Sequence, residues 1–114
     1  MNQFLKRALT KRERRVQRTY LIDDVLYAFL KKTGKEYNIS TSDLLNMCIF
    51  ELETLFASQN YQLYIFKKGT NYALHTFQID ISNVEKLQAM KKRTSLKIKT
   101  LINMSIFNVV QSKK

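Results

Sequence analysis

The sequence predicts an α+β protein, mainly α-helical, in which two copies of a strand–helix–helix unit pack around one core. Three observations predict it. A nine-residue segment, residues 44–52, recurs at residues 101–109 with five identities. A stretch of alternating residues, then one with helical spacing, precedes each copy. An apolar content of 45% is enough to bury a core in a chain of 114 residues.

The first copy is expected over residues 16–58. Alternation from Val16 to Leu21 predicts a strand, and Asp23 is placed to cap the helix that follows. The apolar residues that predict this helix by their spacing are Val25, Leu26, Phe29 and Leu30. Gly34 and Asn38 mark its end, and the run 40–43 supplies caps for the next helix.

The second copy is expected over residues 74–114 and repeats this order. Its strand runs from Leu74 to Ile79, its first helix carries the spacing Val84, Leu87 and Met90, and its turn lies at 93–95. The first copy carries about one extra residue before its turn. Between the copies, residues 59–73 read as a β-hairpin around a Gly-Thr-Asn turn, or as an ordered loop that leads into the second strand.

A net charge of +11 and a pI near 9.9 favour a polyanionic partner, which is DNA, RNA or an acidic membrane surface. A merely solvated basic surface is the alternative. Residues 1–15 form a basic arm with Glu13 as their single acid, or else a mobile tail. Because residues 1–9 are too charged for a signal peptide and no stretch has transmembrane length, we expect a cytoplasmic protein.

The sequence offers little to an enzyme. Cys48 is the single cysteine and lies in an apolar run, so we expect a buried, inert thiol. His75 is the single histidine and has no nucleophile beside it in its strand-like stretch. Two glycines in all do not make a phosphate-binding loop. We therefore expect no catalytic residues, no metal and no cofactor.

With this order of elements, residues 16–56 and 74–110 resemble the ribbon–helix–helix family, the class that includes the MetJ/Arc-type repressors. In that family two copies pair their strands into a two-stranded antiparallel ribbon over four helices, and the ribbon enters the major groove. Two chains usually supply the copies. Here one chain carries both, which implies an intramolecular pseudo-dimer. The chain resembles the tandem versions found among archaeal-virus regulators and plasmid-transfer accessory proteins.

The resemblance implies that the outward side chains of the ribbon contact bases. Phe77 and Ile79 are expected to face the helices in the second strand. The expected base-contacting set is Val16, Arg18, Tyr20, Leu74, Thr76 and Gln78. Arg18 suits guanine and Gln78 suits adenine, so the two half-sites should differ. A slip of one residue in the first strand would place outward a different set, Gln17, Thr19 and Leu21.

Phosphate contacts are implied at the N-terminus of the second helix of each copy, where free N–H groups favour an anion. The residues at these positions are Ser40, Thr41, Ser42, Ser95 and Lys97. The basic arm adds Lys11, Arg12, Arg14 and Arg15, which directly precede the first strand.

The sequence therefore predicts a double-stranded DNA-binding regulator of transcription, most simply a repressor that covers a promoter, with two molecules able to associate side by side. An architectural accessory at a plasmid origin of transfer is the first alternative. An antitoxin-type interaction protein is the second, although residues 111–114 offer little partner-binding extension. RNA binding is disfavoured because the aromatic residues near 61–72 look like hairpin packing. We expect no membrane partner.

Overall fold

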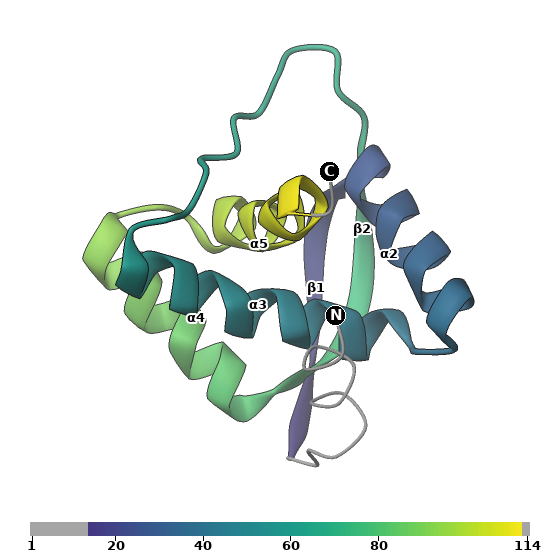
Figure 1. The fold of residues 1–114 in the computed structure, drawn as a ribbon, viewed down its shortest axis with the longest axis horizontal. Helices are drawn as coiled ribbons and strands as arrows, with labels where there is room; N and C mark the ends of the chain where they lie inside the picture. Colours follow the sequence, from purple (N-terminus) through teal and green to yellow (C-terminus); the bar gives the residue numbers. More distant parts are fainter. Residues whose placement is uncertain (1–13, 113–114) are drawn as a thin grey trace.

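The computed structural model describes residues 14–112 and is an α+β fold, mainly helical, with four helices and a two-stranded antiparallel sheet in that range. In chain order the elements are β1 (Arg15–Asp23), α2 (Asp24–Tyr37), α3 (Thr41–Ser58), β2 (Tyr72–Asp80), α4 (Ile81–Thr94) and α5 (Ile98–Ser112). Strand, helix and helix therefore occur twice in the same order. The strands of the two copies lie side by side although most of the chain between them forms helices (Figure 1).

The two copies keep one spacing throughout. β2 begins 57 residues after β1 (Tyr72 against Arg15), and α4 begins 57 residues after α2 (Ile81 against Asp24). The second helices keep the same spacing, with Ile98 against Thr41. The expected extra residue in the first copy is therefore wrong. Matching Leu21 with Ile79 creates it, whereas the constant spacing matches Ile22 with Ile79.

Local sequence explains where the first two helices begin and end. The Asp23 side chain accepts a hydrogen bond from the backbone N–H of Val25 at 2.9 Å, which caps α2. Asn38 ends α2 in the left-handed conformation at φ 56°, a region that asparagine tolerates. Ser40 then caps α3 by accepting from the N–H of Asp43 at 3.0 Å. The caps expected from the sequence are confirmed in this copy.

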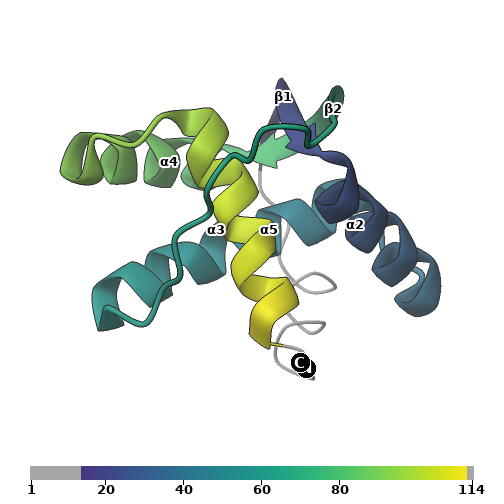
Figure 2. The same ribbon diagram turned by 90° about the horizontal axis from the view of Figure 1, so that it is seen from above.

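The core lies between the sheet and the helices. Ile22, Phe77 and Ile79 point from the sheet toward α3 and α5, and each is at most 1% exposed. The helices contribute the remaining buried side chains, which include Leu45, Ile49, Leu52, Leu101, Ile102 and Ile106. Figure 2 shows all four helices on one side of the sheet, and no described helix covers its other face.

The segment between α3 and β2 does not form the expected hairpin. Residues 60–71 contain no strand, and the second arm alone is present, because β2 runs continuously from Tyr72. Asn108 of α5 replaces a partner strand: its side chain accepts from the N–H of Gln62 at 2.7 Å and donates to its carbonyl at 2.8 Å. Tyr64 packs its ring edge-on against Phe107, so the aromatic residues are buried against α5.

Two further expectations concern single residues and the membrane. Cys48 is a free thiol that is 1% exposed, and burial raises its pKa to about 12, which confirms the inert thiol. His75 stacks on Tyr27 with 3.5 Å between ring centroids, so it serves a packing contact. None of the helices over residues 14–112 is long and apolar enough to cross a membrane.

Candidate nucleic-acid interface

The uncovered face of the sheet carries six side chains in three cross-strand pairs. The register pairs Gln17 with Gln78, Thr19 with Thr76, and Leu21 with Leu74. Residues directly opposite each other in an antiparallel sheet share one face. The hydroxyls of Thr19 and Thr76 confirm the shared face, since they are hydrogen-bonded at 2.7 Å. We call these six residues the outer face of the ribbon.

The outer face is accessible. Both glutamines and both threonines are exposed, Leu74 is 67% exposed, and Leu21 is half-buried. In the second strand the expected outward residues, Leu74, Thr76 and Gln78, lie on this face as predicted. In the first strand the outer residues belong to the alternative register.

The assignment of Val16, Arg18 and Tyr20 to the outer face is therefore wrong. These residues pair with Ile79, Phe77 and His75 on the side that faces the helices. Tyr20 is half-buried and stacks on Phe77 with 6.5 Å between ring centroids, and burial raises its pKa. Arg18 remains exposed on that side and donates to the backbone carbonyl of Gln17 at 2.9 Å.

Two buried asparagines fix the position of the ribbon on the helices. Asn46 of α3 donates to the carbonyl of Gln78 at 2.9 Å and accepts from the N–H of Asp80 at 2.7 Å. Asn103 of α5 makes the same pair of bonds to Leu21 and Asp23 in the other strand, each at 2.9 Å. Each copy thus uses the asparagine of its second helix to bind the strand of the other copy. We call Asn46 and Asn103 the asparagine clamps.

The sequence prediction did not include the asparagine clamps. Asn46 and Asn103 are 4% and 0% exposed, respectively. A signal was present, because they occupy matching positions in the repeated segments 44–52 and 101–109. A polar residue that recurs inside an apolar helical face has its hydrogen bonds satisfied within the protein.

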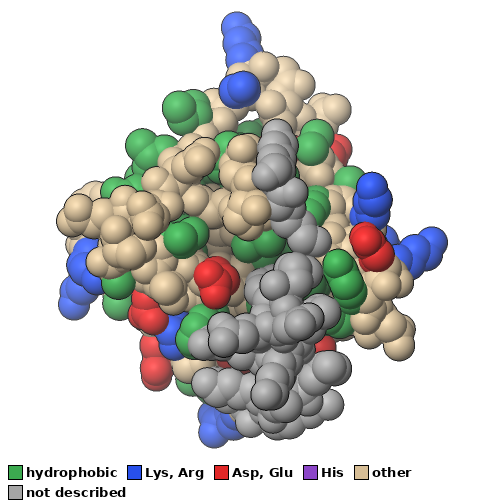
Figure 3. All heavy atoms as spheres, viewed as in Figure 1, with side chains coloured by type: hydrophobic (Ala, Val, Ile, Leu, Met, Phe, Trp, Pro, Cys, Tyr) green, Lys and Arg blue, Asp and Glu red, His purple; other side chains and the backbone are tan. Residues whose placement is uncertain are grey.

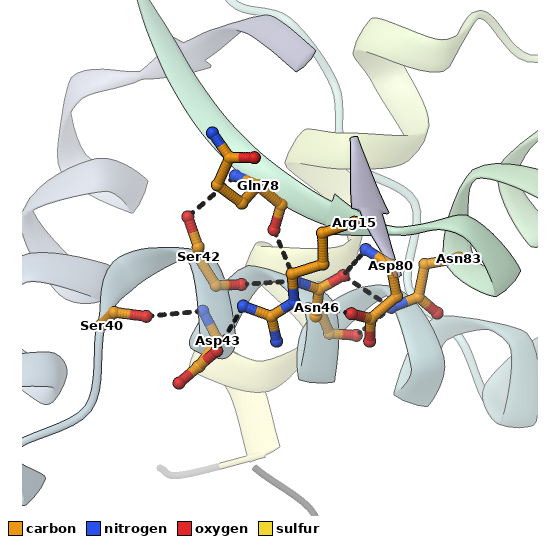
Figure 4. Close-up of polar contacts among 8 residues, drawn as sticks. All are labelled: Arg15, Ser40, Ser42, Asp43, Asn46, Gln78, Asp80 and Asn83. Carbon is orange, nitrogen blue, oxygen red and sulfur yellow. Dashed lines mark hydrogen bonds and ion pairs between the residues drawn. The ribbon is translucent and has the colours of Figure 1, made fainter. Parts of the chain in front are cut away.

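One end of the ribbon lies at the N-terminus of α3 (Figure 4). Ser42 accepts a hydrogen bond from the N–H of Gln78 at 2.9 Å, so its hydroxyl joins the helix to the strand. Arg15 bridges two carboxylates, with 2.7 Å to Asp43 and 2.7 Å to Asp80. The Arg15 charge is therefore largely compensated inside the protein, although it was expected to serve a phosphate.

Ser40 and Thr41 stand at the start of α3, where the expected anion site lies. Ser40 is exposed and its hydroxyl caps the helix, while Thr41 is the first helical residue and is half-buried. Asp43 in the first turn contributes a negative charge. This end therefore combines a favourable helix dipole with an acid that opposes a phosphate.

The other end of the ribbon lies near the start of α5, since Asn103 and Leu21 are bonded there. Ser95 is not at this helix start: it ends α4 in the left-handed conformation at φ 62°. Lys97 is exposed immediately before α5, and its carbonyl accepts from the N–H of Leu101. Lys99 lies over the Phe66 ring, with its Nζ 4.8 Å from the ring centroid.

The structure describes only part of the arm that is expected to hold phosphates. Lys11 and Arg12 lie outside the described residues. Arg14 is exposed next to β1, and its carbonyl accepts from the N–H of Ile81 at 3.1 Å. The two described arginines of the arm therefore differ: Arg15 is held by two carboxylates, whereas Arg14 is open to solvent beside the ribbon.

Charge is not gathered on the side of the molecule that α3 and α5 occupy. Figure 3 shows this side, where Lys and Arg side chains stand mostly at the rim and acidic side chains also occur within the outline. Among residues 14–112, no group of three His, Cys, Asp or Glu side chains could hold a metal ion.

No protein-family model, curated protein sequence or solved structure matches this chain.

Proposed function

We propose that the chain binds double-stranded DNA in a sequence-specific way and regulates transcription, with the ribbon inserted into the major groove. The two copies would act as the halves of a pseudo-dimer of the ribbon–helix–helix type. The observation that carries this proposal is the outer face of the ribbon: six side chains on a two-stranded sheet, open to solvent, with every described helix on the opposite side.

The dimensions and chemistry of this face support the proposal. The major groove of B-DNA is wide enough to admit a two-stranded ribbon. Glutamine presents a donor and an acceptor that match the N6 and N7 atoms of adenine, and threonine can bond a base or contact a methyl group. Gln17, Thr19, Thr76 and Gln78 are exposed side chains of these types.

The charge of the chain supports a DNA partner as well. A net charge of +11 gives an affinity for phosphate that is independent of sequence. Arg14 stands next to β1, and Lys97 precedes α5 at the other end of the ribbon. Contacts of this kind position a protein on the duplex, while the bases are read by the ribbon.

Binding of the full chain to DNA, measured by fluorescence anisotropy, tests the proposal. The duplexes are the best sequence from a selection on random DNA and a scrambled duplex of equal length. Gln17→Ala and Gln78→Ala should each weaken binding to the selected duplex by about 1–3 kcal/mol and leave binding to the scrambled duplex nearly unchanged. Gln88→Ala, an exposed glutamine of α4, is the matched control and should change neither.

Equal decreases in affinity for both duplexes would show that the glutamines do not read bases. The absence of any preferred sequence in the selection would contradict sequence-specific binding.

A further inference from the structure

The outer face of the ribbon is polar at one end and apolar at the other. Gln17 and Gln78 form the pair at the end that lies near the start of α3. Leu21 and Leu74 form the pair at the end near the start of α5, and Leu74 is 67% exposed. The threonine pair lies between them.

This difference cannot be removed by turning the ribbon around. With the constant spacing of 57 residues, Gln17 corresponds to Leu74 and Leu21 corresponds to Gln78. A half-turn about the centre of the antiparallel pair therefore places the leucine pair where the glutamine pair was. Two half-sites of equal sequence would meet different chemical groups at the two ends.

Each pair suits a different feature of the major groove. A glutamine amide can make two hydrogen bonds to the N6 and N7 atoms of adenine. A leucine offers neither donor nor acceptor, and the apolar group that DNA presents in this groove is the C5-methyl of thymine. An exposed leucine gains free energy when such a methyl covers it.

Resting on the proposed function, we propose that the ribbon binds DNA in one orientation, with the glutamine pair on adenines of one half-site and the leucine pair on thymine methyl groups of the other. The recognised site is therefore non-palindromic. The leucine half depends on methyl groups, and the glutamine half depends on adenine N7.

The first test uses the unmodified protein and altered DNA, so protein folding is not in question. In the selected duplex, thymines are replaced by deoxyuridine, which lacks the methyl group, in one half-site at a time. Each methyl removed from the leucine half should weaken binding about fourfold. Deoxyuridine in the glutamine half should have no effect. There, 7-deazaadenine, which lacks N7, should instead weaken binding by about tenfold for each adenine read.

The second test makes the two ends alike. The double variant Leu21→Gln, Leu74→Gln carries glutamine at both ends, and selection with it should return a palindrome, whereas the unmodified chain returns a non-palindromic site. Leu74→Ala keeps one end apolar and small, and should remove most of the dependence on thymine methyls. Circular dichroism and the free energy of unfolding check that each variant is folded.

Two outcomes would overturn the inference. A palindrome selected by the unmodified chain, or equal deoxyuridine effects in both half-sites, would refute oriented reading and leave the proposed DNA binding intact. No preference for any duplex in the selection would refute the proposed function and this inference with it.

Discussion

Thr19 and Thr76 occupy corresponding positions in the two copies, and they are also partners across the ribbon, with their hydroxyls hydrogen-bonded at 2.7 Å. Corresponding residues can face each other in this way at the centre of an antiparallel pair alone. The bond therefore marks the point about which the two strands are arranged. The asparagine clamps, Asn46 and Asn103, lie on either side of it and are equivalent in the same sense.

The asparagine clamps should be essential for stability. Asn46→Ala or Asn103→Ala leaves a carbonyl and an N–H of the opposite strand without a side-chain partner, which should cost about 2–4 kcal/mol of the free energy of unfolding. Chemical denaturation followed by circular dichroism measures this. Asn60→Ala, at an exposed asparagine, is the control and should stay within about 0.5 kcal/mol. Equal values for the clamps and the control would contradict their role.

Gly34 should not tolerate a side chain, although it lies inside α2. A Cβ atom there would stand 2.5 Å from the backbone oxygen of Ile39, in the turn that leads to α3. Gly34→Ala should therefore lower the free energy of unfolding by about 1–2 kcal/mol, even though alanine favours a helix by about 1 kcal/mol. Lys32→Ala, at an exposed position of the same helix, should be nearly neutral. A stabilised Gly34→Ala protein would show that the turn can yield.

The basic arm should act on all DNA sequences alike. Replacing Lys11, Arg12 and Arg14 by glutamine should weaken binding to selected and scrambled duplexes by the same factor. It should also reduce the slope of log K against log salt concentration by about 0.9 for each phosphate that the arm no longer neutralises. Replacing Lys31, Lys32 and Lys35 of α2 removes the same charge and should change the slope much less. Matching slope changes in both variants would reduce the arm to bulk charge.

Cys48 should report unfolding. It is 1% exposed, and burial raises its pKa to about 12, so the thiolate needed for alkylation is scarce at pH 8. Iodoacetamide should therefore label the folded protein slowly, and the unfolded protein in denaturant at once. Glutathione in the same solution checks that the reagent is active. Labelling at one rate with and without denaturant would show that the thiol is open in the folded state.

Much of the fold could be predicted because both copies repeat their second helix closely. The match between residues 44–52 and 101–109 identifies both second helices, and the caps Asp23 and Ser40 are readable from their residue types. The outward residues of the second strand are also predictable, because Phe77 and Ile79 are large and apolar in alternate positions. Strong local patterns therefore identify the elements.

The face of the first strand could not be read from polarity alone. Arg18 lies on the helix-facing side and yet stays exposed, while Leu21 lies on the outer face, so hydrophobicity does not report the side. The pair Ile22-Asp23 matches Ile79-Asp80 at the spacing of the second helices, and that match gives the correct register. A register error of one residue reverses every side chain of a strand.

The hairpin prediction before β2 failed for a different reason. Alternating aromatic residues in 61–66 have the composition of a strand, but their partner is the side chain of Asn108, which binds both the N–H and the carbonyl of Gln62. That contact joins residues 46 positions apart, and local sequence does not contain it.

The central claim is that the outer face of the ribbon meets DNA, and titration of the ¹⁵N-labelled chain with the selected duplex tests it most directly. The amide signals of residues 17–21 and 74–78 should shift or broaden most, while those of the last turns of α2 and α3 should stay in place. Undisturbed ribbon signals, with the largest shifts at those helix ends, would contradict the claim.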